Sequence, residues 1–257
     1  MSSPTPLASS VDFAARIGAT SAVATVVATD TISPTLRSVT LSHPDAVKLA
    51  GAPGQDIMIY VGEHDGHARR RRYSVRSVDP VAQELTLWIA TTHEGPGAQW
   101  ARDAAVGDSV DVIGPRGKIF LDEMADWHLF VGGTVALGAF YRMAESIDPP
   151  GRAVFVVELP DPADAVTPVL DEAITPTGIF IDRGDRVAGD PAGILSALAA
   201  FDFPPDEGHA YLFGEFSVVR AAQSALVDRG LAPEQISLKA FWRAGRDNAD
   251  HGEPTKD

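Results

Sequence analysis

The stretch from position 71 to 76 combines three kinds of side chain that together can hold phosphates and an aromatic ring. It reads Arg71-Arg72-Tyr73-Ser74-Val75-Arg76. An arginine can clamp a diphosphate with paired hydrogen bonds. A tyrosine ring can pack against an isoalloxazine, and a serine can reach a flavin's polar edge. We therefore predict that Arg71, Tyr73, Ser74 and Arg76 contact FAD. The alternative is a solvated edge strand whose basic side chains prevent aggregation.

On a strand, successive side chains alternate between the two faces of the sheet. We therefore expect Arg71 and Tyr73 to share one face and Ser74 to lie on the other.

A second group of residues suits the phosphates of the same cofactor. It reads Thr91-Thr92-His93-Glu94-Gly95-Pro96-Gly97-Ala98-Gln99-Trp100. The glycines and Pro96 predict a turn that opens into a short helix, and free amides at a helix N-terminus bind phosphate. We predict a diphosphate site from the amides of Gly97, Ala98 and Gln99, flanked by Gly95 and Trp100. His93 can stack on the adenine or the flavin, or it can serve as a capping or packing residue.

The elements around these motifs change character halfway along the chain. Strand-like alternation marks residues 21–29, 36–42, 57–61, 72–78, 85–91 and 109–113. Six short strands without long intervening helices predict an antiparallel β-barrel. Strands and helices then alternate from residue 127 to 242, which predicts a doubly wound parallel sheet of α/β type that resembles nucleotide-binding domains. We expect a flexible N-terminus over 1–20, the barrel over 21–122, the α/β domain over 123–245 and a polar tail over 246–257.

Composition limits the possible functions. The 257 residues include no cysteine, so no thiolate nucleophile or iron–sulfur cluster can form. The formal net charge of −14 disfavours binding to nucleic acid or anionic membranes. Neither a secretory signal nor a membrane-spanning stretch is evident. We expect a cytoplasmic protein without membrane insertion.

The order of these motifs resembles the siderophore-interacting protein family of FAD-dependent ferric-siderophore reductases. The family pattern R-x-Y-T-V-R corresponds to residues 71–76, and its H…G-P-A-S-x-W-A corresponds to His93 and residues 95–101. Further matches are Gly114-Pro115-Arg116-Gly117, Asp126-Trp127-His128-Leu129-Phe130-Val131-Gly132, Phe213-Gly214-Glu215 and Phe241-Trp242-Arg243-Ala244-Gly245. The resemblance covers roughly Ala22 to Gly245. It implies a ferredoxin-reductase-like fold with FAD in the barrel.

The resemblance also implies roles for residues in the second half. Thr134 would contact the cofactor by a one-residue shift from the family threonine, or it would cap a helix. Glu215 and Arg220 lie where NAD(P)H should approach. Lys239, Trp242 and Arg243 are the candidates for binding an anionic ferric siderophore. Lys239 and Arg243 can alternatively be basic residues that snorkel from a last strand.

Departures from the family pattern leave the reaction open. Where the family reads G-D-E-T-A-x-P-A, this chain has Gly132-Gly133-Thr134-Val135-Ala136-Leu137-Gly138-Ala139. NAD(P)H use is thus possible but less well supported than FAD. The first hypothesis is NAD(P)H-dependent reduction of a ferric siderophore, without an acid–base side chain. The second is a biosynthetic tailoring enzyme, such as an isomerase or cyclase, that keeps FAD and acts on an organic intermediate. The third is a siderophore-binding protein without catalysis.

No metal site is predicted. His64 and His67 flank Asp65-Gly66, and a hairpin turn explains this segment better than metal binding, which needs three ligands with supporting residues around them.

Overall fold

The computed structural model describes residues 5–92 and 94–245. The chain divides into two compact units, Met1–Phe120 and Leu121–Asp257. The boundary, predicted after residue 122, therefore falls two residues earlier. The predicted polar tail over 246–257 lies outside the described residues.

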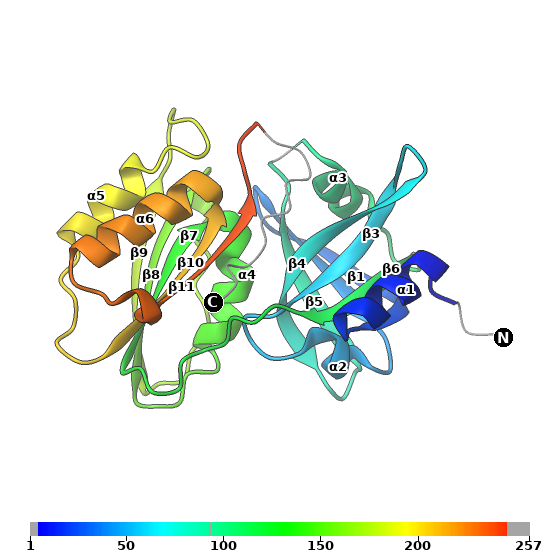
Figure 1. The fold of residues 1–257 in the computed structure, drawn as a ribbon, viewed down its shortest axis with the longest axis horizontal. Helices are drawn as coiled ribbons and strands as arrows, with labels where there is room; N and C mark the ends of the chain where they lie inside the picture. Colours follow the sequence, from blue (N-terminus) through cyan, green and yellow to red (C-terminus); the bar gives the residue numbers. More distant parts are fainter. Residues whose placement is uncertain (1–4, 93, 246–257) are drawn as a thin grey trace. The chain divides into compact units, whose positions relative to one another are not determined.

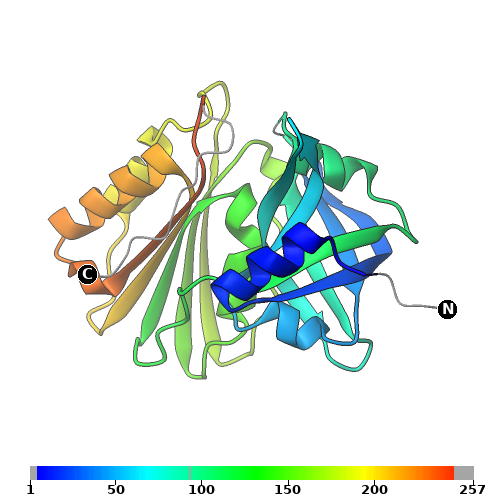
Figure 2. The same ribbon diagram turned by 45° about the vertical axis from the view of Figure 1, so that its right-hand side comes forward.

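Unit 1 is the predicted six-stranded antiparallel barrel (Figures 1 and 2). Its strands close in the order β1-β2-β5-β4-β3-β6. Alternate residues of each strand fill the interior with small and branched apolar side chains, among them Val26, Leu41, Ile57, Leu87 and Val112. The strands are β1 (Thr20–Ser33), β2 (Leu36–Ser42), β3 (Asp56–His64), β4 (His67–Asp79), β5 (Glu84–Ala90) and β6 (Ser109–Arg116). Helices α2 (Ala46–Ala50) and α3 (Pro96–Asp103) lie between strands of the barrel in the sequence.

The turn between β3 and β4 is the hairpin predicted at Asp65-Gly66. His64 pairs with His67, and only two residues lie between them. Asp65 and Gly66 both have positive φ, 50° and 74°, as a two-residue turn that follows the twist of its strands requires. The turn sets the pairing of Glu63 with Ala68, and a register shift between Tyr60 and Glu63 comes before the arginine-rich part of β4, where Arg70 pairs with Tyr60.

The N-terminus differs from the prediction of a flexible segment over 1–20. Residues Ala8–Ile17 form helix α1, which lies against the outside of the barrel (Figure 2). The Ser10 hydroxyl donates to Asp111 Oδ1 at 2.5 Å, and the Leu7 amide donates to Asp111 Oδ2 at 2.8 Å. Arg70 donates to the Ser10 hydroxyl at 2.8 Å. A buried carboxylate on the distant strand β6 thus holds the helix, and short-range sequence patterns do not reveal such a contact.

Unit 2 is a five-stranded parallel sheet in the order β11-β10-β7-β8-β9. Its strands are β7 (Trp127–Gly133), β8 (Gly151–Leu159), β9 (Ile174–Asp182), β10 (Gly208–Glu215) and β11 (Ile236–Trp242). Its helices are α4 (Leu137–Ala144), α5 (Ala192–Ala200) and α6 (Phe216–Asp228), with short 3-10 turns η1 (Thr134–Ala136), η2 (Pro162–Asp164) and η3 (Pro233–Gln235). The predicted α/β unit is confirmed.

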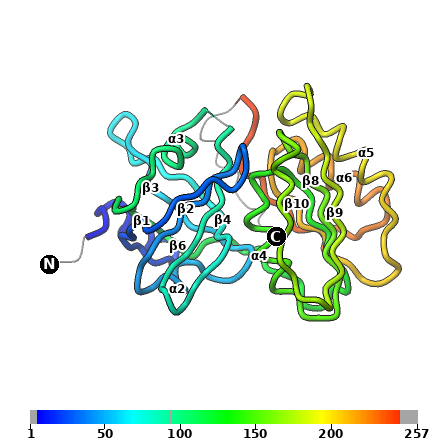
Figure 3. The backbone as a smooth tube through the Cα atoms, turned by 180° about the vertical axis from the view of Figure 1, so that it is seen from behind, coloured from blue at the N-terminus to red at the C-terminus, as the bar shows by residue number. Residues whose placement is uncertain are grey.

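Helices cover both faces of this sheet (Figures 1 and 3). On one face, Ile194 and Leu198 of α5 and Leu226 of α6 pack against alternate strand residues. On the other face, Phe140 and Tyr141 of α4 contact rings of the sheet at centroid distances of 5.4 Å. No helix in the described part of the chain is both long and apolar enough to cross a membrane.

Candidate functional site

Strand β4 places Arg71 and Tyr73 on the same face, as the alternation predicted. They pair with Ile59 and Ile57, whose side chains are buried in the barrel core. Tyr73 packs against that core beside Trp100 of α3, with a ring-centroid distance of 5.8 Å. The part of β4 that carries the motif therefore faces helix α3.

The hydroxyl of Tyr73 lies directly against Gly97 in the first turn of α3. A Cβ at position 97 would stand 2.4 Å from this hydroxyl and 3.0 Å from Arg71 Cγ. Any larger residue would have to displace Tyr73 or Arg71, because atoms cannot approach this closely. Glycine is thus what allows the arginine, the tyrosine and the helix N-terminus to meet.

Tyr73 also carries an unused hydrogen-bonding group. Its hydroxyl is buried and has no partner among the described residues. Burial raises the pKa of this phenol, and the charge of Arg71 opposes the shift only in part, so the group stays a neutral donor. A buried donor without an acceptor is costly. An anionic or polar group bound at the start of α3 would satisfy it, and the residues present therefore fit a flavin dinucleotide.

The first turn of α3 has the features expected of a phosphate site, with one change. Gly95 precedes the helix in an extended conformation and Pro96 occupies its first turn. The amide of Gln99 donates to the Gly95 carbonyl at 2.9 Å, and the Gln99 side chain donates to Asp103 at 2.8 Å. Gln99 is therefore engaged within the helix. The amides of Gly97 and Ala98, which precede the first intrahelical bond, are the better candidates.

Arg72 points away from this group and has a structural partner. It donates to both carboxylate oxygens of Asp56 at 2.7 to 3.1 Å, and the side chain of Asp56 is only 2% exposed. This bidentate pair on β3 and β4 was not predicted from the sequence. The two adjacent arginines therefore have different surroundings. Arg72 neutralises a buried carboxylate, whereas Arg71 lies beside α3.

The remaining predicted residues of unit 1 lie at different places. Ser74 pairs with Asp56 across β3 and β4. Arg76 stacks its guanidinium over the Trp88 ring, 4.9 Å from the centroid. His93 lies outside the described residues. Their roles in binding FAD stay predictions.

In unit 2, the carboxyl ends of the parallel strands carry Thr134, which was predicted to contact the cofactor, and Glu215, which was predicted to bind the nucleotide. Thr134 follows β7 and is 5% exposed. Its hydroxyl is buried, and none of the described residues bonds to it. Strand β7 lies between β8 and β10, where the chain's connections diverge to opposite sides of the sheet. Such a switch point is where α/β sheets bind ligands.

Glu215 lies at the same edge, but its carboxylate already accepts three hydrogen bonds from backbone amides. Its Oε2 accepts from the amides of Ser217 at 2.5 Å and Val218 at 3.1 Å, so it caps α6. Its Oε1 accepts from the Ala244 amide at 3.1 Å. The carboxylate thus fills the helix N-terminus itself. Arg220 is exposed on α6 and donates to Gln223 at 2.8 Å.

The three predicted substrate residues do not form one exposed cluster. Lys239 is 3% exposed, and its amino group lies 5.8 Å from the Phe241 ring centroid. Trp242 is half-buried and pairs with Glu215 in the sheet register. Arg243 stacks over the Phe216 ring at 4.7 Å. The structure therefore brings Glu215, Trp242 and Arg243 together at the carboxyl end of β10 and β11, with Lys239 buried farther along the strand.

Comparison with known proteins assigns both units. Residues 125–245 match the family described as siderophore-interacting protein, and residues 54–119 match the siderophore-interacting FAD-binding domain. A siderophore utilization protein from T. fusca superimposes with a TM-score of 0.80 at 25% identity, over 91% of this chain and 96% of that one. The ferredoxin reductase in carbazole 1,9a-dioxygenase has a TM-score of 0.66 at 22% identity, over 87% of this chain and 70% of that one.

Sequence relatives include proteins with assigned activities. Ferric vibriobactin reductase ViuB of Vibrio cholerae is 26% identical over 71% of this chain and 68% of its own length. The NADPH-dependent ferric-chelate reductase of Escherichia coli is 23% identical over 65% and 63%. Uncharacterized protein Rv2895c of Mycobacterium tuberculosis is 29% identical over 68% of this chain, and the match spans 65% of its length.

The barrel followed by the parallel sheet is the fold of the ferredoxin reductase in carbazole 1,9a-dioxygenase, and the barrel unit is an FAD-binding domain. The chain belongs to the siderophore-interacting protein family.

Proposed function

We propose that this protein is a flavin-dependent oxidoreductase that uses NAD(P)H to reduce a ferric siderophore. The observation that carries the proposal is the group formed by Arg71, Tyr73 and Gly97, because its buried, unpartnered hydroxyl and its close approach to a helix N-terminus suit FAD. Relatives named as a ferric vibriobactin reductase and an NADPH-dependent ferric-chelate reductase support the reaction.

The predicted flavin-binding residues of the barrel each have a role in holding the cofactor. Arg71 neutralises the diphosphate, and the amides of Gly97 and Ala98 donate to it. The Tyr73 ring provides an apolar wall and its hydroxyl donates a hydrogen bond, while Ser74 and Arg76 approach the polar edge. Bound FAD supplies the conversion between two-electron and one-electron chemistry. The protein's contribution is position and charge.

The second unit provides the remaining contacts. The hydroxyl of Thr134 is an available hydrogen-bonding group at the switch point of the sheet, beside which a nicotinamide dinucleotide would bind. Arg220 is an exposed cation on α6 that can pair with its phosphates. Arg243 and Trp242, with Lys239 on the same strand, contribute positive charge and an aromatic surface for an anionic ferric complex.

An anaerobic stopped-flow experiment tests this function. The yellow protein is mixed with NADH or NADPH, and bleaching of the flavin absorbance is followed at about 450 nm. We expect bleaching by at least one nucleotide and rapid reoxidation by a ferric hydroxamate siderophore. Bleaching by dithionite alone would contradict the proposal and favour a tailoring enzyme that keeps FAD. A protein that does not retain or take up FAD would contradict both.

A further inference from the structure

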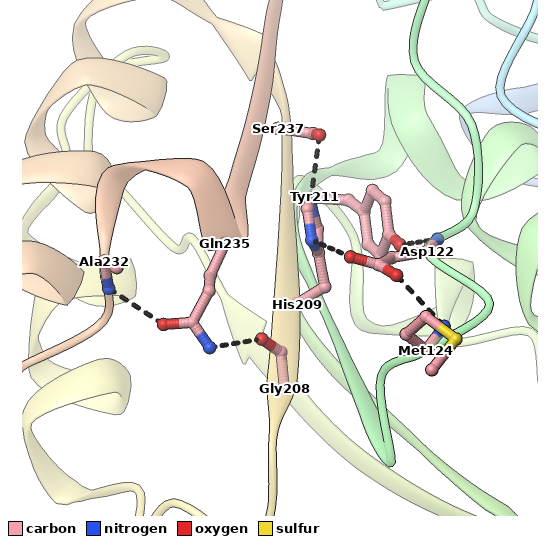
Figure 4. Close-up of polar contacts among 8 residues, drawn as sticks. All are labelled: Asp122, Met124, Gly208, His209, Tyr211, Ala232, Gln235 and Ser237. Atoms are coloured by element: carbon pink, nitrogen blue, oxygen red, sulfur yellow. Dashed lines mark hydrogen bonds and ion pairs between the residues drawn. The ribbon is translucent and has the colours of Figure 1, made fainter.

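Three polar side chains from distant parts of unit 2 form a linear chain of hydrogen bonds (Figure 4). His209 Nε2 lies 2.9 Å from the Ser237 hydroxyl, and His209 Nδ1 lies 3.1 Å from Asp122 Oδ2. Asp122 precedes β7, His209 is the second residue of β10, and Ser237 is the second residue of β11. No part of the flavin site described above uses these residues.

The carboxylate is held in place by its own surroundings. Asp122 Oδ1 accepts from the Met124 amide at 3.0 Å, which leaves Oδ2 directed at the histidine. The Asp122 amide donates to the Tyr211 hydroxyl at 2.7 Å. The main chain and side chain of Asp122 are thus both fixed, and the carboxylate is oriented before any reactant arrives.

The histidine is fixed as well. Its ring lies 4.8 Å from the Tyr211 ring, and its side chain is 9% exposed. Ionisable groups near it include Asp122, His128 and Tyr211. A carboxylate acceptor at Nδ1 favours the tautomer with its proton there, which leaves Nε2 as the acceptor for the serine hydroxyl.

Ser237 is accessible to a reactant although its base is not. The serine is half-buried, on the edge strand β11, whereas His209 is buried. Neighbouring contacts hold the start of this strand, because Gln235 donates to the Gly208 carbonyl at 3.0 Å and accepts from the Ala232 amide at 2.9 Å. A nucleophile, a base within hydrogen-bonding distance and a group that orients the base are what nucleophilic catalysis requires.

We infer that Ser237 is a nucleophilic serine, activated by His209 and Asp122, that reacts with small carboxylic esters. The Ser237 oxygen bonds to the ester carbonyl carbon while its proton passes to His209 Nε2. The bond to the leaving oxygen breaks, and that oxygen takes the proton to leave as an alcohol. Water then attacks the acyl-serine by the same route and releases the carboxylic acid. This reaction needs no flavin or reductant and is independent of the proposed function.

A fluorophosphonate probe tests the inference on the full-length, FAD-loaded protein. The serine oxygen displaces fluoride from phosphorus, and the modified residue is located by peptide mass spectrometry. We expect labelling at Ser237. The labelling rate should be lower by about tenfold or more in Asp122→Asn and His209→Gln, because each variant loses the base or the group that orients it. Ser237→Ala should not be labelled. Ser224→Ala is the matched control, because Ser224 is an exposed serine on α6 whose hydroxyl donates to the Arg220 carbonyl.

A second measurement avoids variants that disturb folding. Because the chain has no cysteine, Ser237→Cys introduces a single thiol beside His209. We expect iodoacetamide to alkylate it faster at pH 7 than the thiol of Ser224→Cys, although position 224 is more exposed. Turnover of p-nitrophenyl acetate that depends on Ser237 would support the ester substrate. Absent labelling at Ser237, or a rate unchanged by His209→Gln, would overturn the inference and leave these contacts a purely structural role.

Discussion

Gly97 and the Tyr73 hydroxyl are so close that a Cβ on residue 97 would stand 2.4 Å from the hydroxyl oxygen. The contact joins the first turn of α3 to the middle of β4. It brings the helix amides, the phenol and the stem of Arg71 to one place in unit 1. The geometry of the proposed flavin site therefore depends on residue 97 having no side chain.

Gly97→Ala should lower FAD retention. Alanine favours helices over glycine by up to about 1 kcal/mol, so α3 itself should not be weakened. The added methyl must instead displace Tyr73 or Arg71. The measurement is the ratio of flavin to protein absorbance after purification, followed by titration with FAD. Gly95→Ala is the control, since a Cβ there meets nothing within 4 Å. Equal flavin content in the two variants would contradict the assignment.

Arg71→Ala and Arg72→Ala should affect different properties, although the residues are adjacent. Arg71→Ala should weaken FAD binding and change stability little. Arg72→Ala removes the bidentate partner of the buried Asp56 carboxylate, which should cost roughly 3 kcal/mol or more of unfolding free energy. Urea unfolding and FAD titration of both variants separate the two effects. If Arg72→Ala lost flavin while keeping its stability, the two roles would have to be exchanged.

The stability of unit 2 should decrease in mild acid because of His128. This residue is 2% exposed, and burial, with a smaller contribution from His209, lowers its pKa from 6.5 to about 4. Below pH 6.5 His128 binds a proton in the unfolded chain but stays neutral in the folded chain until the pH approaches 4. Stability is therefore unaffected above that pH, falls as the pH drops from 6.5 to 4, and then levels off.

The size of this effect follows from the pKa difference. At pH 4.5 the penalty should be roughly 2–3 kcal/mol relative to pH 7.5, at 1.36 kcal/mol per pH unit. His128→Phe and His128→Gln cannot titrate and should each lose less stability over this range. Urea unfolding at both pH values measures the difference. The same loss in all three proteins would place the acid sensitivity elsewhere.

Glu215→Ala should destabilise α6 and the segment after β11. The carboxylate caps two amides of the helix and binds the Ala244 amide, and loss of a helix cap costs about 1 kcal/mol. Glu215→Gln keeps an acceptor oxygen and should recover part of this loss. Thermal unfolding gives the comparison. If the alanine variant were as stable as wild type but reacted more slowly with NAD(P)H, Glu215 would serve the nucleotide rather than the fold.

The sequence predicted the strands and the two-unit architecture because those signals are local. Alternation along residues 36–42, for example, reports directly on burial in β2, which spans the same residues. The positions of Arg71 and Tyr73 on one face follow from the same period of two. The Asp65-Gly66 turn was predictable because its chemistry is contained in two residues.

Long-range polar contacts were not predictable in this way. Helix α1 depends on Asp111, 101 residues after Ser10. His209 contacts residues 87 positions before it and 28 positions after it. Alternation along β4 could not identify Asp56 as the partner of Arg72. Such pairs arise from the sheet register, which no single stretch of sequence contains.

The closure of unit 1 by its first and last strands sets an order for folding during synthesis. Residues Thr20–Thr25 of β1 pair with Ser109–Gly114 of β6, so β1 keeps an open edge until almost all of the unit has left the ribosome. The Asp111 carboxylate that holds α1 arrives at the same late stage. Open strand edges invite wrong pairing. A nascent chain that pauses before residue 109 therefore carries an unclosed barrel, and this is when chaperones would be needed most.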